Sequence, residues 1–520
     1  MPPISRRARV VALAATAAAA AAGCGGRTPT DAPVAVPAPP VVLPPEPPLP
    51  VLLARDASPE FRAVADALVA AMREARIPGA ALGILAGGRE EHASFGVASL
   101  SSLRPVNPNT LFQIGSLTKT FTATAVWRLI DEGKLALDAP VRRYLRGLRL
   151  RDEATITAVT VANLLEHTAG WYGDEGFDTG DDAFALTRYV DTRLPELPQL
   201  FECGEFFSYN NSAFSLLGRL IELTVTTDYN DAMVKLVLGP LGLANTVLDR
   251  EAVLKRPYAD GHTAMPVNGR DTVAVQTPLW VPRSADPAGG IWSTTRDVLR
   301  YARLHLGLEP PGRTRIVTPA SLQAMQEPAV GIPGLPLSMG RSWFSQDVDG
   351  LRVISHDGDT GGQHTVFVAV PQRRFAFILL LNGQPGAMAG LAALNEALAR
   401  YPGLGPLSGK VGLISALLVA PDTPKAGPGE QLRAYAGRYA DPGMTETFRM
   451  TGPGLERTVE PTPEPGSWQP AIVAPPPGPE PVGFLERDIA VSGGMRLPFV
   501  RHRDGGVGWV ADGLRLRPRV

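Results

Sequence analysis

The sequence predicts an α+β fold, in which an antiparallel sheet is flanked by helices and a small β-barrel-like domain follows at the C-terminal end. Strand-like apolar runs occur early, at 80–100, and late, at 351–383, and the region between them is mostly helical in pattern. This arrangement suggests one sheet built from both ends of a domain. Short strand-like runs separated by turn residues then fill 431–520, which is the pattern of a small barrel or sandwich.

The first 23 residues resemble a bacterial lipoprotein signal peptide. Arginines at 6, 7 and 9 precede an apolar run that is too short to span a bilayer and ends in Ala-Ala-Gly-Cys. This ending is similar to a lipobox, whose cysteine is acylated after the chain is cut before it. We therefore expect lipidation at Cys24 and an exported protein that is lipid-anchored in the bacterial cell envelope, on the periplasmic side or at the cell surface. A plain secretory signal with an incidental cysteine is the alternative.

Proline-rich stretches divide the rest of the chain. Residues 24–58 are predicted to be a Pro-rich linker, because proline favours extended polyproline geometry and makes a semi-rigid spacer. The main domain is predicted at 59–402, a Gly/Pro-rich linker at 403–430 and the β-rich domain at 431–520.

Each element of the main domain is predicted from a local pattern. An amphipathic helical pattern at 61–79 closes at a Pro-Gly pair, and the two early strand-like runs are joined by Gly87-Gly88. A further helix carries Lys119, and a terminal helix is predicted at 391–401. The other helical patterns lie at 160–170, 212–225, 229–243 and 294–308.

Composition excludes several classes of partner. A formal net charge of -1 gives no electrostatic reason to expect nucleic acid or an anionic membrane surface, so membrane contact is expected through the lipid anchor only. With two cysteines there is no disulfide framework, and Cys203 is expected to be a packed small hydrophobe. Because no convincing metal-ligand spacing occurs, we expect no metal and no organic cofactor.

The first candidate site is the pentapeptide GSLTK, in which Ser116 stands three positions before Lys119 at the predicted start of a helix. Residues three apart on a helix lie on one face, so the lysine can take the serine's proton if burial disfavours its ammonium form. An ordinary helix start followed by a surface lysine is the alternative. Only six of the 50 basic residues are lysines, however, and arginine, which the chain uses almost everywhere else, cannot act as a base.

Two further candidate sites come later in the chain. Tyr209 and Asn211 stand just before a helical pattern, where a phenol can relay a proton and an amide can hold a substrate carbonyl. His356 and Gly358 lie in a late strand-like run, and glycine there lets a substrate backbone approach closely. Viewed alone, each has a structural alternative, namely a packed aromatic beside a capping asparagine and a satisfied polar histidine. A second His-x-Gly at 305–307 is predicted to be a helix end.

Together, the three motifs resemble the serine β-lactamase and penicillin-binding superfamily, whose S-x-x-K signature carries an acylated serine. The resemblance is greatest to the class C β-lactamase-like branch, which includes D-alanyl-D-alanine carboxypeptidases, D-aminopeptidases and esterases. It runs from about residue 60 to 400 and includes the stretches DEGKLALDAPVRRYL, VANLLEHTAGW, GPLGLANT and PAGGIWSTTRDVLRYA. The resemblance also implies a helical subdomain beside the sheet.

The resemblance implies a role for each candidate residue. Ser116 would be the acylated nucleophile and Lys119 its base. Tyr209 would pass a proton to the leaving group and help to activate the deacylating water, and Asn211 would orient the substrate. His356 would contribute to the electrostatics around the phenol and a substrate carboxylate.

The oxyanion hole implied by the resemblance consists of two backbone N–H groups, those of Ser116 and Asp359. Where relatives often carry threonine, this chain has Asp357. If Asp357 and Asp359 pointed into the pocket, they would repel an anionic penicillin or peptide C-terminus. This departure favours an esterase or amidase acting on a neutral or cationic substrate over an efficient β-lactamase.

Two nearby features are expected to play no part in the chemistry. His167, in LLEHTAGW, is predicted to be a packing residue. The acidic run at 173–183 lacks the spacing of a calcium-binding loop and is predicted to be a solvated loop near the rim of the pocket.

The leading hypothesis is an envelope serine hydrolase that acts through an acyl-enzyme on an ester or amide, such as an esterase, D-amino-acid peptidase or β-lactamase-type substrate. The alternative is a non-catalytic binding or sensor lipoprotein that keeps the fold. Chemically competent residues at every motif position favour the enzyme.

Overall fold

The computed structural model describes residues 41–42, 49–174, 176–267, 270–276, 279–308, 315–384, 386–418, 432–461 and 478–520. The predicted signal peptide and most of the first linker, including Cys24, lie outside the described residues. Among the helices in the described ranges, none is both long enough and apolar enough to cross a bilayer.

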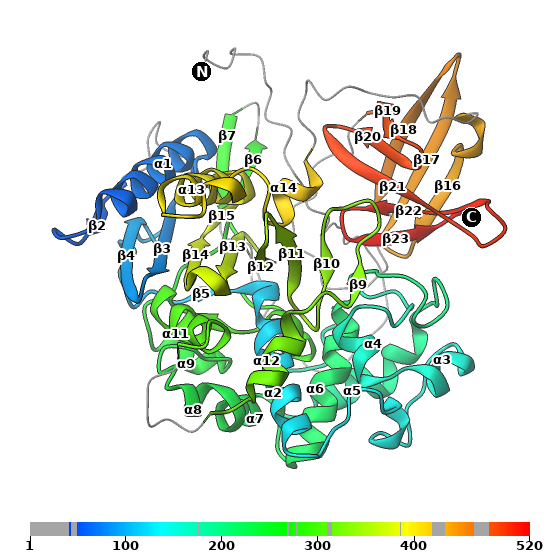
Figure 1. Ribbon diagram of the computed structural model, residues 1–520, viewed down its shortest axis with the longest axis horizontal. Helices are drawn as coiled ribbons and strands as arrows, with labels where there is room; N and C mark the ends of the chain where they lie inside the picture. The colour runs from blue at the N-terminus through cyan, green and yellow to red at the C-terminus, as the bar shows by residue number, and fades with distance from the viewer. Residues whose placement is uncertain are drawn as a thin grey trace.

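A nine-stranded antiparallel sheet forms the centre of the main domain (Figure 1). Its strands are β2 (Val51–Leu53), β3 (Gly79–Ala86), β4 (Arg89–Gly96), β9 (Val330–Gly331), β10 (Ser338–Met339), β11 (Phe344–Val348), β12 (Leu351–Thr360), β13 (Gln363–Val370) and β14 (Phe375–Leu381). Their order is β2-β4-β3-β14-β13-β12-β11-β10-β9. The early strand β3 pairs with the late strand β14, with Leu82 opposite Leu379. The prediction of one sheet built from both ends of the domain is confirmed.

Helices cover both faces of this sheet. The longer ones are α1 (Pro59–Ala75), α2 (Thr118–Asp131), α5 (Ala185–Thr192), α6 (Asn211–Val225), α11 (Thr295–His305), α12 (Pro319–Gln326) and α13 (Gly386–Arg400). The shorter helical segments are η1 (Gly115–Leu117), η2 (Val141–Arg143), α3 (Glu153–Ala158), α4 (Val161–Leu165), η3 (Leu194–Glu196), α7 (Tyr229–Met233), η4 (Val234–Leu238), α8 (Gly239–Leu241), α9 (Arg250–Leu254), η5 (Arg283–Ala285), α10 (Asp286–Gly289), η6 (Pro371–Arg373), η7 (Gly405–Leu407), α14 (Leu413–Leu417) and η8 (Leu432–Ala434).

The two faces of the sheet bury separate cores. On one face, residues of α1 and α13 form a core together with alternate apolar residues of β13, such as Val366 and Val368. On the other face, α2, α6 and α11 form a larger core together with Phe367 and Ile378. Because side chains alternate along a strand, successive side chains of β12 and β13 point toward one face of the sheet and then the other. This alternation decides which side chains can reach α2.

Several predicted helices differ in extent from their sequence patterns. The pattern at 160–170 forms only the short α4, since His167 adopts a left-handed backbone conformation with φ 57°. The pattern at 229–243 divides into α7, the π-helical η4 and α8. The prediction that His305 ends a helix is confirmed, because α11 stops there and Gly307 has φ 65°.

A small sheet was not predicted from the sequence. It joins β1 (Val41–Val42), β7 (Arg270–Val275), β6 (His262–Val267) and β15 (Gly383–Gln384), in that order. A further two-stranded pair joins β5 (Phe112–Gln113), which lies just before Ser116 in the chain, to β8 (Trp292–Ser293). This pair ties the segment that leads into η1 to the segment that follows α10.

The C-terminal region forms an eight-stranded antiparallel sheet, which is nearly closed into a barrel. Its strands are β16 (Gly437–Asp441), β17 (Met444–Thr451), β18 (Gly454–Pro461), β19 (Glu480–Glu486), β20 (Ile489–Ser492), β21 (Met495–Arg501), β22 (Val507–Asp512) and β23 (Arg515–Pro518). A bridge between Tyr439 and Arg519 brings the first and last strands together. The predicted β-barrel-like domain is confirmed.

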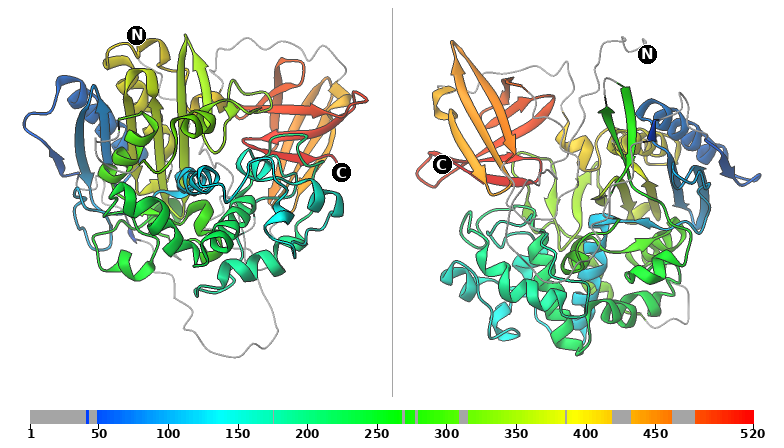
Figure 2. Two further views of the ribbon diagram at one scale, coloured as in Figure 1. Left: turned by 60° about the horizontal axis from the view of Figure 1, so that its bottom comes forward. Right: turned by 180° about the vertical axis from the view of Figure 1, so that it is seen from behind.

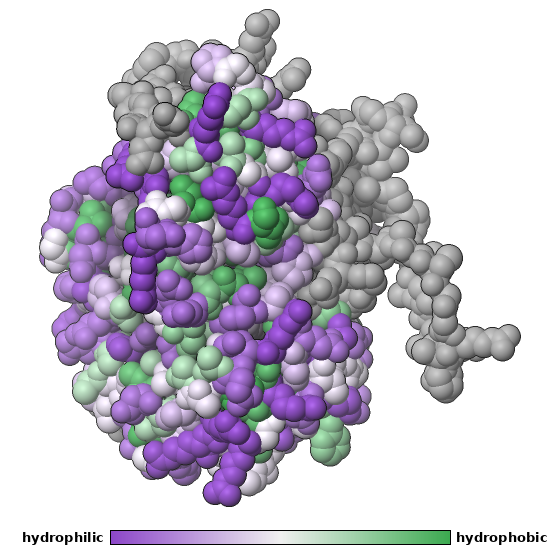
Figure 3. Space-filling view, turned by 90° about the vertical axis from the view of Figure 1, so that its right-hand side faces the viewer, coloured by the Kyte–Doolittle hydropathy of each residue, from purple (hydrophilic) through white to green (hydrophobic). Residues whose placement is uncertain are grey.

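The barrel lies on the same side of the molecule as the helices α3, α4 and α5, as the two views in Figure 2 show. Apolar contacts join the two parts: Trp509 and Leu516 of the barrel pack with Phe201 of the main domain. The surface on the barrel side has hydrophobic residues scattered among hydrophilic ones (Figure 3), which is usual for an exposed protein face.

Candidate active site

Ser116 lies in η1, a single 3₁₀ turn that runs directly into α2. Gly115, just before it, has φ 53°, a left-handed conformation that suits glycine, and a methyl group there would lie 2.8 Å from the Asp359 nitrogen. The predicted helix start is therefore a tight turn pressed against β12. This contact brings the serine to the strand that carries the third motif.

Lys119, one turn further along, is fully buried. Its Nζ lies 3.1 Å from Ser116 Oγ and donates a hydrogen bond to the Ala288 carbonyl at 2.8 Å. Burial lowers the pKa of Lys119 well below its ordinary value, and the positive charge of Arg515 lowers it further, while Asp174 opposes the shift. A neutral lysine within hydrogen-bond distance of a hydroxyl can accept its proton.

Tyr209 lies beside this pair, with the centroid of its ring 4.8 Å from Lys119 Nζ. Burial raises the pKa of its phenol, and the neighbouring Ser116 side chain opposes the shift. The hydroxyl is buried, and no hydrogen bond of good geometry reaches it from the described residues. The phenol is therefore protonated and has a bond to offer to a ligand.

His167 stacks against the ring of Tyr209. The two rings stack with centroids 4.4 Å apart, and the Asn210 N–H donates to His167 Nδ1 at 2.9 Å. Burial lowers the pKa of His167, and the charge of Lys119 adds to that effect. The prediction of a packing residue is correct as far as contacts go, but what His167 packs is the candidate proton relay.

His356 is buried on β12, with its ring centroid 6.3 Å from that of Tyr209. Its Nδ1–H donates to the Asp357 carbonyl at 2.6 Å. Burial lowers the pKa of His356 to about 3, and Lys119 contributes to the shift. The ring is therefore neutral at pH 7 and presents Nε2 as an acceptor, so it cannot supply a positive charge to a substrate carboxylate.

Gly358 provides the close approach that the sequence suggests. A methyl group on this residue would collide with the Ile114 carbonyl oxygen and would lie 3.0 Å from the Ser116 nitrogen. The backbone of β12 can therefore lie against η1 only because position 358 has no side chain. The N–H groups of Ser116 and Asp359, which the resemblance assigns to an oxyanion hole, are brought together by this contact.

Asn211, at the start of α6, is half-buried and points toward an acidic residue. Its Nδ2 donates to Asp174 Oδ1 at 2.9 Å. Asp174 is the first acidic residue of the run that was predicted to be a solvated loop. That prediction is wrong for this residue, whose side chain is only 21% exposed.

Asp357 does not share a face of β12 with His356. It pairs in register with Val366, which belongs to the core beneath α13, and it is buried. Burial raises its pKa to about 7, Asp359 adds to the rise and His364 opposes it. The supposition that Asp357 repels anionic substrates from the pocket therefore lacks a geometric basis.

The side chain of Asp359 also points away from Ser116. Its carboxylate accepts a hydrogen bond from His364 Nδ1 at 2.7 Å. Burial lowers the pKa of His364, but the charges of Asp359 and Asp357 outweigh it, and the pKa is raised overall. This leaves only the backbone of Asp359 at the candidate site.

Arg515 is a site residue that the sequence did not indicate. It comes from β23 of the barrel and forms an ion pair with Asp174. Its guanidinium carbon lies 5.1 Å from the centroid of the Tyr209 ring. The motif LRLRPRV, in which it stands, reads as a strand and carries no sign of a role in the main domain. Only the folded arrangement shows this contact.

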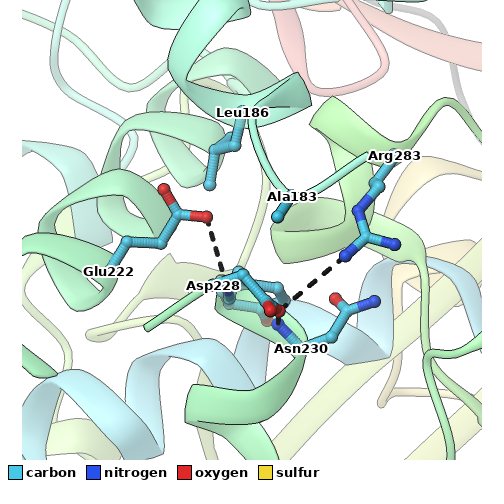
Figure 4. A pocket seen from close by; sticks show the side chains of 7 residues that line it. Ala183, Leu186, Glu222, Asp228, Asn230 and Arg283 are labelled. Carbon is cyan, nitrogen blue, oxygen red and sulfur yellow. Dashed lines mark hydrogen bonds and ion pairs between the residues drawn. The ribbon is translucent and has the colours of Figure 1, made fainter. Parts of the chain in front are cut away.

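A separate small pocket lies at the far end of α6 and does not include Ser116 (Figure 4). Its lining includes an ion pair between Arg283 and Asp228 and a hydrogen bond from the Tyr229 N–H to Glu222 at 3.1 Å. Its polar groups thus have partners on neighbouring elements. No cluster of three or more metal-ligating side chains occurs among the described residues.

The sheet, the helical layer and the arrangement of Ser116 beside the buried Lys119 and Tyr209 define the class of serine β-lactamases and penicillin-binding proteins. The Beta-lactamase family model matches residues 64–401, and the chain belongs to this family. Penicillin-binding protein 4 of Amycolatopsis lactamdurans is 33% identical over 318 residues, which cover 60% of this chain and 82% of that protein. Esterase EstB of Burkholderia gladioli is 31% identical over 264 residues, covering 44% of this chain and 66% of the esterase.

A solved structure extends the likeness beyond the family match. The crystal structure of SurE aligns with a TM-score of 0.66 and 25% identity, covering 89% of this chain and 99% of SurE. Because residues 59–402 alone cannot account for 89% of the chain, the alignment includes residues outside the predicted main domain.

Proposed function

We propose that this protein is a serine hydrolase that cleaves an ester or amide through an acyl-enzyme at Ser116. The observation that supports this most directly is the buried Lys119, whose Nζ lies 3.1 Å from Ser116 Oγ in surroundings that disfavour its charge. Membership of the Beta-lactamase family and the likeness to an esterase and to a penicillin-binding protein support the same reaction class.

In the proposed reaction, Ser116 Oγ attacks the carbonyl carbon of the substrate as its proton passes to Lys119. The negative charge on the carbonyl oxygen is stabilised by the backbone N–H groups of Ser116 and Asp359. The carbonyl-to-leaving-group bond then breaks, and the leaving group takes a proton from the phenol of Tyr209, which is restored by Lys119. Water releases the acid product by the reverse order of proton transfers.

Acylation can be tested by intact-mass analysis after incubation with a fluorophosphonate and, separately, with a penicillin. We expect a mass increase of one adduct in the wild type and in Ser102→Ala, which removes an exposed serine, and none in Ser116→Ala. Failure of both probes to label the wild type would favour the alternative, a non-catalytic binding protein that retains the fold.

The substrate class requires a direct comparison of turnover. Nitrocefin, a p-nitrophenyl ester and a D-alanine amide offer the three relevant carbonyls, and at least one of them should be hydrolysed by the wild type and not by Ser116→Ala. Since Asp357 faces the α13 side of the sheet, the structure gives no reason to exclude the anionic nitrocefin. The fastest of the three substrates identifies the branch of the family.

We also propose that the protein is lipid-anchored through Cys24 in the cell envelope, on the strength of the sequence pattern at 21–24 alone. In a bacterial host, the wild type should fractionate with membranes and Cys24→Ser should not. Equal membrane association of the two proteins would contradict the anchor.

A further inference from the structure

The barrel reaches the candidate active site through its last hairpin, formed by β22 and β23. The Tyr209 N–H donates to the Leu514 carbonyl at 2.9 Å, and the Leu516 N–H donates to Ser208 Oγ at 3.1 Å. The residues on either side of Arg515 are thus hydrogen-bonded to the segment that carries the candidate proton relay. These two hydrogen bonds of the hairpin backbone, one from the Tyr209 N–H and one to the Ser208 hydroxyl, fix Arg515 relative to Tyr209.

The side chain of Arg515 is held in the same rigid manner. Both its Nε and its Nη2 contact the carboxylate of Asp174, the Nη2 at 2.8 Å from Oδ1. The same Oδ1 accepts the hydrogen bond from Asn211. One carboxylate therefore links the barrel to the residue that the family resemblance assigns to substrate orientation, and planar two-point pairing of this kind is specific to arginine.

Arg515 also contributes charge to the surroundings of Lys119. The titratable groups that face Lys119 are Tyr209, His167 and His356, together with Asp174 and Arg515. The phenol and both imidazoles are neutral at pH 7, as described above. The two charged groups are consequently Arg515, which disfavours the ammonium form of Lys119, and Asp174, which favours it.

We propose that Arg515 is a positioning residue of the candidate active site, supplied by the barrel. Through Asp174 it fixes Asn211, it covers the ring of Tyr209, and it places a permanent positive charge near Lys119. The barrel thus contributes a residue to the hydrolase site. The inference rests on the proposed function, because its effect is on the acylation of Ser116.

The test is the pH dependence of fluorophosphonate labelling of Ser116 in the full-length protein. In Arg515→Gln the midpoint of the acidic limb should move up by about one pH unit, because a neighbouring positive charge is lost. In Asp174→Asn it should move down, because a negative charge is lost. Arg438→Ala, an exposed arginine on β16 of the same barrel, should titrate like the wild type. A merely structural ion pair would give Arg515→Gln and Asp174→Asn the same effect.

The variant Arg515→Lys distinguishes the effect of losing a charge from the effect of disturbing the fold. It keeps the positive charge without the two-point pairing, so its midpoint should lie nearer to that of the wild type than the midpoint of Arg515→Gln does, even if both variants label more slowly. Midpoints that are unshifted, or shifted in one direction in both Arg515→Gln and Asp174→Asn, would overturn this inference while leaving the acyl-enzyme intact. A wild type that is not labelled at all would overturn the proposed function itself.

Discussion

Lys119 shows how surroundings can change the chemistry of one side chain. On an exposed helix it would be a charged, hydrated group, but here it is buried beside the aromatic rings of Tyr209 and Phe214 and donates a hydrogen bond to one backbone carbonyl. The desolvation of the ammonium is what makes proton transfer from Ser116 reasonable at neutral pH. An arginine cannot take this role, because it stays charged in proteins.

Lys119→Arg should therefore slow fluorophosphonate labelling of Ser116 by about 10²–10⁴-fold, which is the usual contribution of a general base. Lys134→Arg is the matched control, since it makes the same substitution at an exposed position just after α2. Labelling of Lys119→Arg at the rate of the control would show that Lys119 is not the base.

The buried carboxyl group of Asp357 leads to a second prediction for a single residue, which concerns how the stability of the fold depends on pH. Its pKa in the folded protein is about 7 and therefore lies above its value in the unfolded chain. The folded state thus binds the proton more tightly, and stability falls as the pH rises from about 4 to about 7. A shift of about three units corresponds to at most about 4 kcal/mol.

Asp357→Asn should remove this penalty. The free energy of unfolding of the variant, measured by urea denaturation, should exceed that of the wild type by an amount that grows from pH 4 to pH 8. Asp66→Asn, at an exposed position of α1, should show no such trend. A constant difference between Asp357→Asn and the wild type across this range would contradict the burial argument.

At the scale of elements, the contact between η1 and β12 determines whether the candidate oxyanion hole exists. Gly358→Ala should force the strand away from the Ile114 carbonyl and reduce Ser116 labelling by about 10²–10³-fold, the cost of one lost oxyanion donor. Gly331→Ala, in β9 of the same sheet, adds its methyl group to open space and should label normally. Unchanged labelling of Gly358→Ala would show that the backbone contact is dispensable.

The elements were predictable where periodicity is strong. The strands β3, β13 and β14 were visible as apolar runs, because strands buried on both faces are largely apolar. The strands β4 and β12 carry polar residues and were visible mainly through their place beside these runs. The hairpin of β6 and β7 has no such run and was missed. The left-handed residue at 167, which shortens α4, is set by tertiary contacts that no local pattern contains.

The candidate site was predictable where its residues stand in sequence motifs. Ser116, Lys119, Tyr209, Asn211 and His356 stand in recognisable motifs. The structure brings Ser116, Lys119, Tyr209 and His356 together and links Asn211 to Tyr209 through Asp174 and Arg515. The face on which Asp357 lies depends on strand register, which the sequence left open. Arg515 and Asp174 could not be foreseen, because their pairing depends on how a second domain docks.

At the scale of the whole molecule, docking of the barrel is the property to test. Trp509→Ala should loosen the contact with Phe201 and Leu200, since truncating a buried tryptophan typically costs about 3–5 kcal/mol. Hydrogen–deuterium exchange should then rise in β22, in β23 and in residues 205–211. Phe184→Ala removes an aromatic ring that is 65% exposed and should leave these segments protected. Equal exchange in Trp509→Ala and the wild type would show that other contacts hold the barrel.

The ion pair between Arg515 and Asp174 joins residues that are 341 positions apart in the chain. Contacts of such long sequence separation form slowly, because a large loop must close before they can contribute. During refolding, the helices and the hairpins of each part should therefore appear before the site is complete. Recovery of helical circular dichroism should precede recovery of Ser116 labelling, and the interval between them would report the time that the barrel takes to find its place.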